Sequence, residues 1–249
     1  SGLTSIIIPE GVTAIGEWAF SYCSGLTSII VDENNTTYDS RNNCNAIIKT
    51  ASNTLIVGCK LTVIPEGVKA IGKRAFSGCD GLTSITIPES VTAIGDDAFY
   101  SCDGLTSITI PEGVTAIGES AFLGCSGFTS ITIPEGVTAI EYATFMGCSG
   151  LTSIISLNTT PPSCDGSYVF YNVDKSIPLY VPKESVDSYK SAQCWSEFTN
   201  IVGNMVRLTI KDTENGMVTG AGVYPVDNTA TVTATPNAGY AFVKWSDGN

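Results

Sequence analysis

The sequence contains no histidine, and its basic residues are few. Lysine and arginine together number 12 against 24 aspartates and glutamates, so the 249-residue chain carries a net charge of -12. This negative charge repels nucleic acid and anionic membrane surfaces, which makes both of them poor partners. A run of about 18 apolar residues is also missing, so we expect no membrane insertion in this segment.

Recognisable catalytic motifs are missing as well. Without histidine, the chain lacks the side chain that most often serves as a general base or a metal ligand. It has no Gly-x-Ser-x-Gly sequence, no phosphate-binding loop and no Cys-x-x-Cys pair.

Carboxylates are the remaining candidates for chemistry, because pairs of them hydrolyse glycans and groups of them bind calcium. The glutamates that recur at one place in the chain are equivalent to one another, which is typical of a solvated rim: Glu10, Glu66, Glu89, Glu112 and Glu135. We therefore expect no enzymatic activity, no cofactor and no metal site.

What the chain does contain is one sequence motif that recurs at a fixed period. Pro65, Pro88, Pro111 and Pro134 lie 23 residues apart, and Pro9 heads one further copy. A fixed period of about 20 to 50 residues is typical of a solenoid, in which each unit buries its apolar face only by stacking on its neighbours. Hydrophobic residues form 43% of the sequence, which is enough for a continuous inner stack.

Within each copy, apolar residues recur at the same places, as in Leu82, Ile85, Val91, Ile94 and Phe99. The Ser-Ile-Thr-Ile segment alternates with period two, which predicts a short strand that ends at the following proline. Val-x-x-Ile-Gly predicts a second extended segment, and Ala-Phe-x-x-Cys predicts a single helical or 3₁₀ turn that buries the phenylalanine. The expected fold is mainly β, a solenoid of short strands and single helical turns.

Nine cysteines suggest a disulfide framework, but five of them occupy one place in the repeat. Stacked coils lie roughly 4.8 Å apart and point equivalent side chains in one direction, which is poor geometry for a disulfide. We expect a column of buried, unpaired thiols at Cys23, Cys79, Cys102, Cys125 and Cys148. The sequence does not pair the other four, Cys44, Cys59, Cys164 and Cys194.

We divide the chain into three parts. Residues 1–156 form the solenoid, and residues 32–64 interrupt it as an enlarged coil with a projecting β-hairpin, which is either an ornament or a binding surface. Residues 157–203 form a C-terminal cap with a short helix and Trp195 in its core, because a solenoid must cover its last open edge. Residues 204–249 form a small β module without a closing strand, so we expect it to be truncated.

The repeat Cys-x-x-Leu-x-x-Ile-x-Ile-Pro-x-x-Val-x-x-Ile-Gly-x-x-Ala-Phe-x-x-Cys resembles the BspA-type leucine-rich repeat of bacterial surface and secreted proteins. The resemblance covers residues 1–156 and implies a right-handed leucine-rich-repeat solenoid. The tail from Val232 to Gly248 resembles the divergent internalin B-type repeat, a small spacer of exported proteins. Together they imply an extracellular or cell-surface protein of a host-associated bacterium. Because the chain opens in the middle of a repeat, we expect its signal and its anchor outside this segment.

Recognition by a solenoid is expected where its coils differ. Two neighbouring variable columns hold Trp18, Arg74, Asp97, Ser120 and Ala143, and Glu17, Lys73, Asp96, Glu119 and Tyr142. Tryptophan, tyrosine and arginine anchor interfaces more often than other residues do. Tyr22 and Tyr100 lie close to these columns in the sequence. The candidate partner-binding residues are therefore Trp18, Tyr22, Arg74, Tyr100 and Tyr142. The alternative is drift on an unconstrained surface.

A second possible surface is the array of Thr86, Thr109 and Thr132, which either binds an ordered lattice or simply suits an exposed strand. The sequence as a whole favours a non-enzymatic, exported scaffold that binds an extracellular protein or glycan, as in adhesion. The alternative is a purely structural surface or spacer protein without a specific ligand. The ligand, the face that binds it and the oligomeric state stay open.

Overall fold

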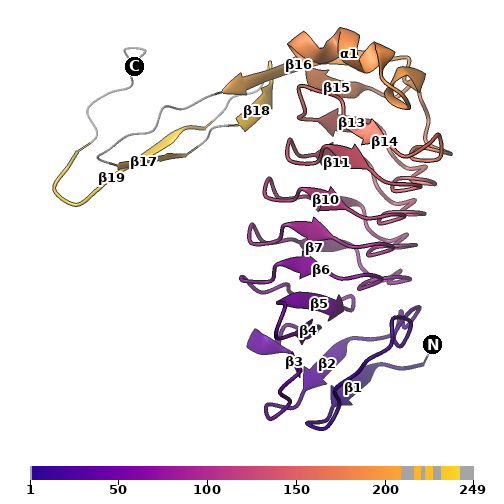
Figure 1. Ribbon diagram of the computed structural model, residues 1–249, viewed down its shortest axis with the longest axis vertical. Helices are drawn as coiled ribbons and strands as arrows, with labels where there is room; N and C mark the ends of the chain where they lie inside the picture. Colours follow the sequence, from indigo (N-terminus) through magenta and orange to yellow (C-terminus); the bar gives the residue numbers. More distant parts are fainter. Residues whose placement is uncertain (1, 209–215, 220–221, 227–230, 242–249) are drawn as a thin grey trace.

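The computed structural model describes residues 2–208, 216–219, 222–226 and 231–241. The coils stack along the long axis of the molecule, from β1 (Ser5–Ile8) near the N-terminus to α1 (Val186–Ser191) at the other end (Figure 1). The predicted fold class, a mainly β solenoid of 23-residue repeats, is confirmed.

The Ser-Ile-Thr-Ile segments form the first side of the stack. Each pairs in parallel with the equivalent segment of a neighbouring coil, so that Ser84 lies opposite Ser107 and Ile85 opposite Ile108. The isoleucines point inward and are buried, while the flanking serines and threonines point outward. These strands are β1, β2 (Ser28–Val31), β7 (Ser84–Thr86), β9 (Ser107–Thr109), β11 (Ser130–Ile133), β13 (Ser153–Ser156), β15 (Leu179–Pro182) and β16 (Ile201–Leu208).

The Val-x-x-Ile-Gly segments form the second side, which confirms the second extended segment. Its short strands pair in parallel with the same register, as Ala93 with Ala116. They are β6 (Ala70–Ile71), β8 (Ala93–Ile94), β10 (Ala116–Ile117), β12 (Ala139–Ile140) and β14 (Ser163–Cys164).

The third side consists of hydrogen-bonded turns in place of the predicted helical or 3₁₀ turn, and Phe76 is buried as predicted. Arg74 has a left-handed backbone with φ 57°, which interrupts a helix, and its N–H donates to Asp96 O of the next coil at 2.9 Å. The next N–H, that of Ala75, instead closes a turn on Gly72 O at 3.2 Å. Alternate amides thus bond between coils and within the turn. The equivalent left-handed residues in the following coils are Asp97, Ser120 and Ala143.

The insert at residues 32–64 contains the predicted hairpin, but the hairpin does not project. It consists of β4 (Ile47–Lys49) and β5 (Thr54–Val57), preceded by β3 (Tyr38–Asp39). Strand β5 also pairs in parallel with β6, so the hairpin extends the second side of the stack. Both of its faces are apolar and buried: Ile48 and Leu55 join the main core, while Ile47 and Val57 join the core of the first coil.

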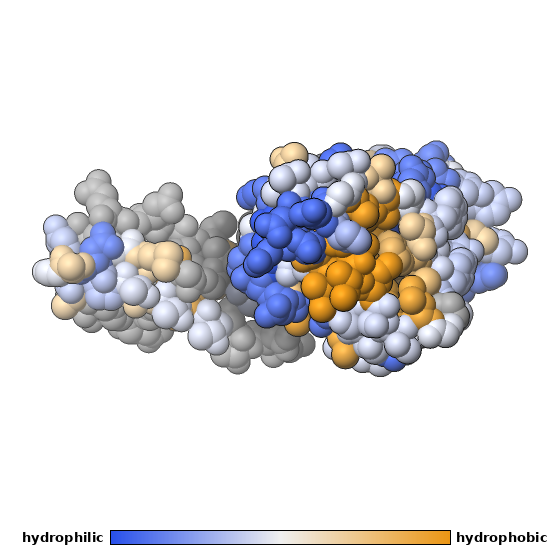
Figure 2. Space-filling view, turned by 90° about the horizontal axis from the view of Figure 1, so that it is seen from below, coloured by the Kyte–Doolittle hydropathy of each residue, from blue (hydrophilic) through white to orange (hydrophobic). Residues whose placement is uncertain are grey.

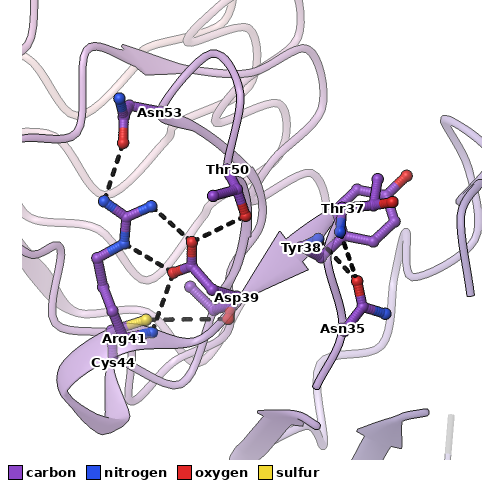
Figure 3. Close-up of polar contacts among 9 residues, drawn as sticks. Asn35, Thr37, Tyr38, Asp39, Arg41, Cys44, Thr50 and Asn53 are labelled. Carbon is purple, nitrogen blue, oxygen red and sulfur yellow. Dashed lines mark hydrogen bonds and ion pairs between the residues drawn. The ribbon is translucent and has the colours of Figure 1, made fainter. Parts of the chain in front are cut away.

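Polar contacts hold the loop of this insert (Figure 3). Arg41 Nε donates to Asp39 Oδ1 at 2.7 Å, and Arg41 Nη1 donates to Asn53 Oδ1 at 2.9 Å. Thr50 Oγ1 donates to Asp39 Oδ2 at 3.1 Å. Burial raises the pKa of Asp39, but the hydrogen bonds from Arg41 outweigh it and leave that pKa below its usual value.

A column of stacked phenylalanine rings runs through the core. Adjacent ring centroids lie 5.1, 5.5, 5.6 and 5.6 Å apart, with planes within 7° of parallel. The rings belong to Phe76, Phe99, Phe122, Phe145 and Phe170. Each pair therefore keeps two successive coils in register.

The predicted column of unpaired thiols lies beside these rings. Cys79, Cys102, Cys125 and Cys148 are buried, whereas Cys23 in the first coil is half-buried. Cys125 Sγ donates to Phe99 O at 3.1 Å, and Cys102 and Cys148 make the equivalent bonds. Burial raises the pKa of the Cys79 and Cys148 thiols to about 12. Small size, apolar packing and a weak donor together explain the choice of cysteine.

The stack continues beyond residue 156, into the segment predicted to be the cap. Strand β14 pairs with β12, and Phe170 extends the phenylalanine column. The cap itself contains β15, a 3₁₀ turn at Lys183–Ser185, α1 and a second 3₁₀ turn at Trp195–Glu197. Trp195 is fully buried, as predicted, and its Nε1 donates to Pro162 O at 2.7 Å.

Two of the four cysteines that the sequence leaves open form a disulfide. Cys164 and Cys194 are bonded, with their Cα atoms 6.4 Å apart, and join the last coil to the cap. Cys44 and Cys59 are buried free thiols in the insert.

The C-terminal segment contains the predicted short strands. β18 (Gly222–Pro225) pairs antiparallel with β16, and β17 (Gly216–Thr219) pairs antiparallel with β19 (Thr233–Pro236). The alternating sequence from Gly239 to Trp245 predicts one more strand, but most of it lies outside the described residues.

Candidate functional site

The third side of the stack carries the candidate residues, and we call it the turn face. It consists of residues 16–22, 73–78, 96–101, 119–124, 141–147 and 167–172. The amide ladder between coils keeps these segments in register; for example, the Ser120 N–H donates to Tyr142 O at 2.9 Å. Side chains at equivalent positions therefore form columns along the stack.

At the N-terminal end of the turn face, Arg74 lies in a network of contacts within the chain. Its guanidinium carbon lies 3.7 Å from the centroid of the Trp18 ring. Its two terminal nitrogens pair with Glu17 and Asp97, each at 2.9 Å. The Arg74 side chain is only 14% exposed, so most of its binding capacity is already used. Burial raises the pKa of Asp97 more than Arg74 lowers it.

Tyr22 and Tyr100 lie beside this network. The Tyr22 N–H donates to Ser77 O at 3.2 Å, and its ring packs against Gly78, where a Cβ would lie 2.5 Å from the ring. Burial and the neighbouring Tyr100 raise the pKa of Tyr22. Trp18 and Tyr22 nevertheless remain 59% and 52% exposed. The structure thus brings four of the five predicted residues together, in what we call the N-terminal cluster (Trp18, Tyr22, Arg74 and Tyr100).

The fifth predicted residue, Tyr142, belongs to a different group at the other end of the turn face. Its ring centroid lies 5.6 Å from that of Tyr168, which lies 5.7 Å from that of Tyr171. All three rings are between 41% and 48% exposed. We call these three residues the tyrosine cluster.

Sequence reasoning missed Tyr168 and Tyr171 because the 23-residue spacing changes there. Phe170 follows Phe145 by 25 residues, so the 23-residue period does not extend to it. The signal that finds them is the Tyr-x-Phe-Tyr sequence around Phe170, which places aromatic residues on both sides of a core phenylalanine.

Charge is distributed unevenly along the stack. The basic residues of the first 174 positions all lie between Arg41 and Arg74. Residues 75–174 contain no lysine or arginine. The same stretch holds 11 acidic residues: Asp80, Glu89, Asp96, Asp97, Asp103, Glu112, Glu119, Glu135, Glu141, Asp165 and Asp174. This half of the stack therefore presents a negative potential that attracts cationic groups.

A cavity of about 20 Å³ lies where the first coil meets Arg74 and Phe76. A space of this size holds one water molecule and no sugar or peptide side chain. Arg74 Nε and Ser77 Oγ, which border it, are buried and have no hydrogen-bond partner within the described residues. Nowhere in the described part of the chain do three or more potential metal ligands gather.

The outward side chains of the first side form a separate surface. Of the predicted threonine array, Thr86 and Thr109 lie in register and are exposed, whereas Thr132 is half-buried. In the first coils, Ile7 and Ile30 take the equivalent positions and are also exposed. Figure 2, which views the N-terminal end of the stack from below, shows an apolar patch bordered on one side by hydrophilic residues.

The repeats identify the class of protein. Residues 1–55 and 54–177 match the BspA type leucine rich repeat region in 6 copies. The chain therefore belongs to the BspA-type leucine-rich-repeat family. Residues 206–249 match the divergent InlB B-repeat domain, which agrees with the resemblance of the tail.

Solved structures of bacterial leucine-rich-repeat proteins share the fold. A leucine-rich repeat protein from Eubacterium ventriosum is 28% identical, with a TM-score of 0.63 over 72% of this chain and 48% of its own. A leucine rich cell surface protein from Faecalibacterium prausnitzii is also 28% identical, with a TM-score of 0.52 over 80% of this chain and 48% of its own. The chain thus spans about half the length of both proteins.

The pneumococcal vaccine antigen PcpA is 20% identical, with a TM-score of 0.59 over 80% of this chain and 56% of its own, and supports the fold alone. A comparison with curated protein sequences finds no match. Among the described residues, no helix is both long and apolar enough to cross a bilayer.

Proposed function

We propose that this leucine-rich-repeat scaffold is an exported, cell-surface protein without enzymatic activity, and that it binds an extracellular protein or glycan through the turn face. The observation that carries the proposal is the set of exposed aromatic rings on that face. Trp18, Tyr22 and the tyrosine cluster are each more than 40% exposed, although burying such rings is favourable. Aromatic residues of this kind anchor protein interfaces and sugar contacts.

Two further observations support this proposal. The similar protein from Faecalibacterium prausnitzii is described as a cell surface protein. The cavity beside Arg74 is too small for a substrate, whereas a solenoid presents an extended face suited to a large partner.

The alternative is a structural surface or spacer protein. It is favoured by the regular stack and by the spacer-like C-terminal segment. In that case the exposed rings and isoleucines mediate contacts between copies of the chain and not with a different molecule.

The test is binding of the purified chain to a panel of immobilised host matrix proteins, mucin and glycans, with sedimentation velocity run in parallel. Saturable binding to a member of the panel, with a monomeric chain in solution, supports the proposed function. Concentration-dependent self-association without any ligand supports the structural alternative. Turnover of a panel glycan would contradict the non-enzymatic assignment.

A further inference from the structure

The tyrosine cluster and the carboxylates around it have the chemistry to bind a cation. We propose that Tyr142, Tyr168 and Tyr171, with Glu119, Glu141 and Asp165, dock an arginine- or lysine-bearing segment of the partner protein. This inference rests on the proposed function and specifies the chemistry of the partner at one place on the turn face.

The three rings form a fixed, accessible platform. Their planes are tilted by 48° to 51° to one another, so ring faces and edges are both presented to solvent. Backbone bonds between coils hold their positions: the Gly147 N–H donates to Tyr171 O at 2.8 Å, and Tyr142 O accepts from Ser120. Because these bonds fix the backbone that carries the rings, binding has to order only side chains.

Three carboxylates flank this platform. Glu119 precedes Ser120, whose N–H bonds to Tyr142 O, and Glu141 directly precedes Tyr142. Asp165 belongs to the next coil, and its N–H donates to Ile140 O at 2.9 Å. This bond places Asp165 beside Glu141. All three residues are exposed, and none forms an ion pair within the described part of the chain.

The other end of the same face shows what such a group of residues binds. There the guanidinium of Arg74 lies over the Trp18 ring and pairs with two carboxylates, Glu17 and Asp97. The tyrosine cluster repeats this combination of aromatic faces and carboxylates, but no arginine or lysine of the described chain pairs with these carboxylates. The nearest basic residue in sequence, Lys175, instead donates to Phe170 O at 2.7 Å and pairs with Glu197 at 3.5 Å. A cation from the partner would occupy, at the tyrosine cluster, the place that Arg74 occupies between Trp18 and its two carboxylates.

Charge decides between a basic protein segment and a glycan. Aromatic rings also stack on sugars, and sugar hydroxyls donate hydrogen bonds to carboxylates, but a neutral sugar gains no attraction between opposite charges and an anionic glycan is repelled. A guanidinium gains from both, since it stacks on aromatic faces and forms paired bonds with carboxylates.

The test measures fluorescence anisotropy of a labelled arginine-glycine peptide binding to the whole chain, beside the same peptide with citrulline for arginine. We expect the arginine peptide to bind, the citrulline peptide to bind at least tenfold more weakly, and added salt to weaken the former. In the variant Tyr142→Ala/Tyr168→Ala/Tyr171→Ala, affinity should fall by about fivefold or more. The corresponding triple Tyr→Phe variant keeps the ring faces and should retain binding, and far-UV circular dichroism checks that both variants fold.

A matched pair of charge variants completes the test. Glu119→Gln/Glu141→Gln/Asp165→Asn should weaken peptide binding by a similar factor. The control removes three exposed carboxylates elsewhere, at Glu10, Glu66 and Glu89, and should change affinity less than twofold. Equal loss in both variants, or unchanged binding by the triple alanine variant, would overturn the inference.

The outcome is separable from that of the proposed function. Suppose that a panel ligand binds, that the triple alanine variant loses this binding, and that the arginine peptide does not bind. The turn face is then a binding surface, but the inference of a basic partner is refuted. If neither the panel nor the peptide binds, both proposals fail.

Discussion

The most informative perturbation of the fold is Phe122→Ala, in the middle of the phenylalanine column. Phe122 is fully buried and stacks on Phe99 at 5.5 Å and on Phe145 at 5.6 Å. A third ring, Phe128, lies 5.7 Å away at a tilted angle. The substitution therefore removes ring contacts on both sides and leaves a cavity between two coils.

Truncation of a buried phenylalanine costs about 3–5 kcal/mol, with the larger losses where the surroundings cannot collapse. Here the backbone ladders on all three sides hold the coils apart, so we expect about 4–5 kcal/mol. For a chain of this size, that loss corresponds to a fall in melting temperature of roughly 8–20 °C.

Guanidinium chloride unfolding followed by far-UV circular dichroism measures this loss. The matched control is Leu123→Ala, which truncates the neighbouring, half-buried residue on the turn face and should cost about 1 kcal/mol or less. If Phe122→Ala were no more destabilising than Leu123→Ala, the ring column would not be what holds successive coils together.

Cys194→Ser removes a disulfide between residues 30 apart, and the loop-entropy relation gives a loss of about 3–4 kcal/mol, measurable as a lower melting temperature. An unchanged melt would refute that role. Hydrogen bonds from Arg41 outweigh burial and lower the pKa of Asp39 in the folded protein. The pair therefore stabilises the fold above about pH 4, and this stability is lost as the pH falls through the lowered pKa of Asp39. Arg41→Met should therefore raise the midpoint pH of acid unfolding, while stability stays flat between about pH 6 and 8 in the absence of histidine. The four buried thiols of the column, Cys79, Cys102, Cys125 and Cys148, should resist iodoacetamide until denaturant is added, because burial raises their pKa. Rapid labelling of these four in native protein would contradict the packing.

The repeat made most of the scaffold predictable. Five apolar columns at one spacing predicted the stack and the two extended segments of each coil, because burial between coils forces the same residue types at the same places. Cysteines in one column likewise predicted unpaired thiols. The disulfide was not predictable, since Cys164 and Cys194 lie outside the column and sequence does not give their separation in space.

Two local predictions failed for physical reasons. The turn around Phe76 resembles a helical turn in sequence, but the left-handed Arg74 lets alternate amides bond to the next coil, and only the stacked structure supplies those acceptors. The hairpin of the insert was expected to project, yet both faces of β4 and β5 are apolar and are buried by entering the sheet.

The candidate residues divide along similar lines. Variation between coils correctly indicated the turn face as the place where aromatic and charged residues gather. It did not reveal that Arg74 is held by Trp18, Glu17 and Asp97, because residues 57 apart in sequence meet only across the insert. The tyrosine cluster is therefore the more accessible group, since its residues are 41% to 48% exposed and the Arg74 side chain only 14%.

The measurement that bears most directly on recognition compares two faces of the same stack. Binding of the panel ligand should be measured for the triple tyrosine-to-alanine variant and for Thr86→Ala/Thr109→Ala, which alters exposed residues on the first side. We expect the tyrosine variant to lose binding and the threonine variant to keep it. Loss of binding by the threonine variant, with the tyrosine variant unaffected, would place recognition on the strand side and contradict the turn-face assignment.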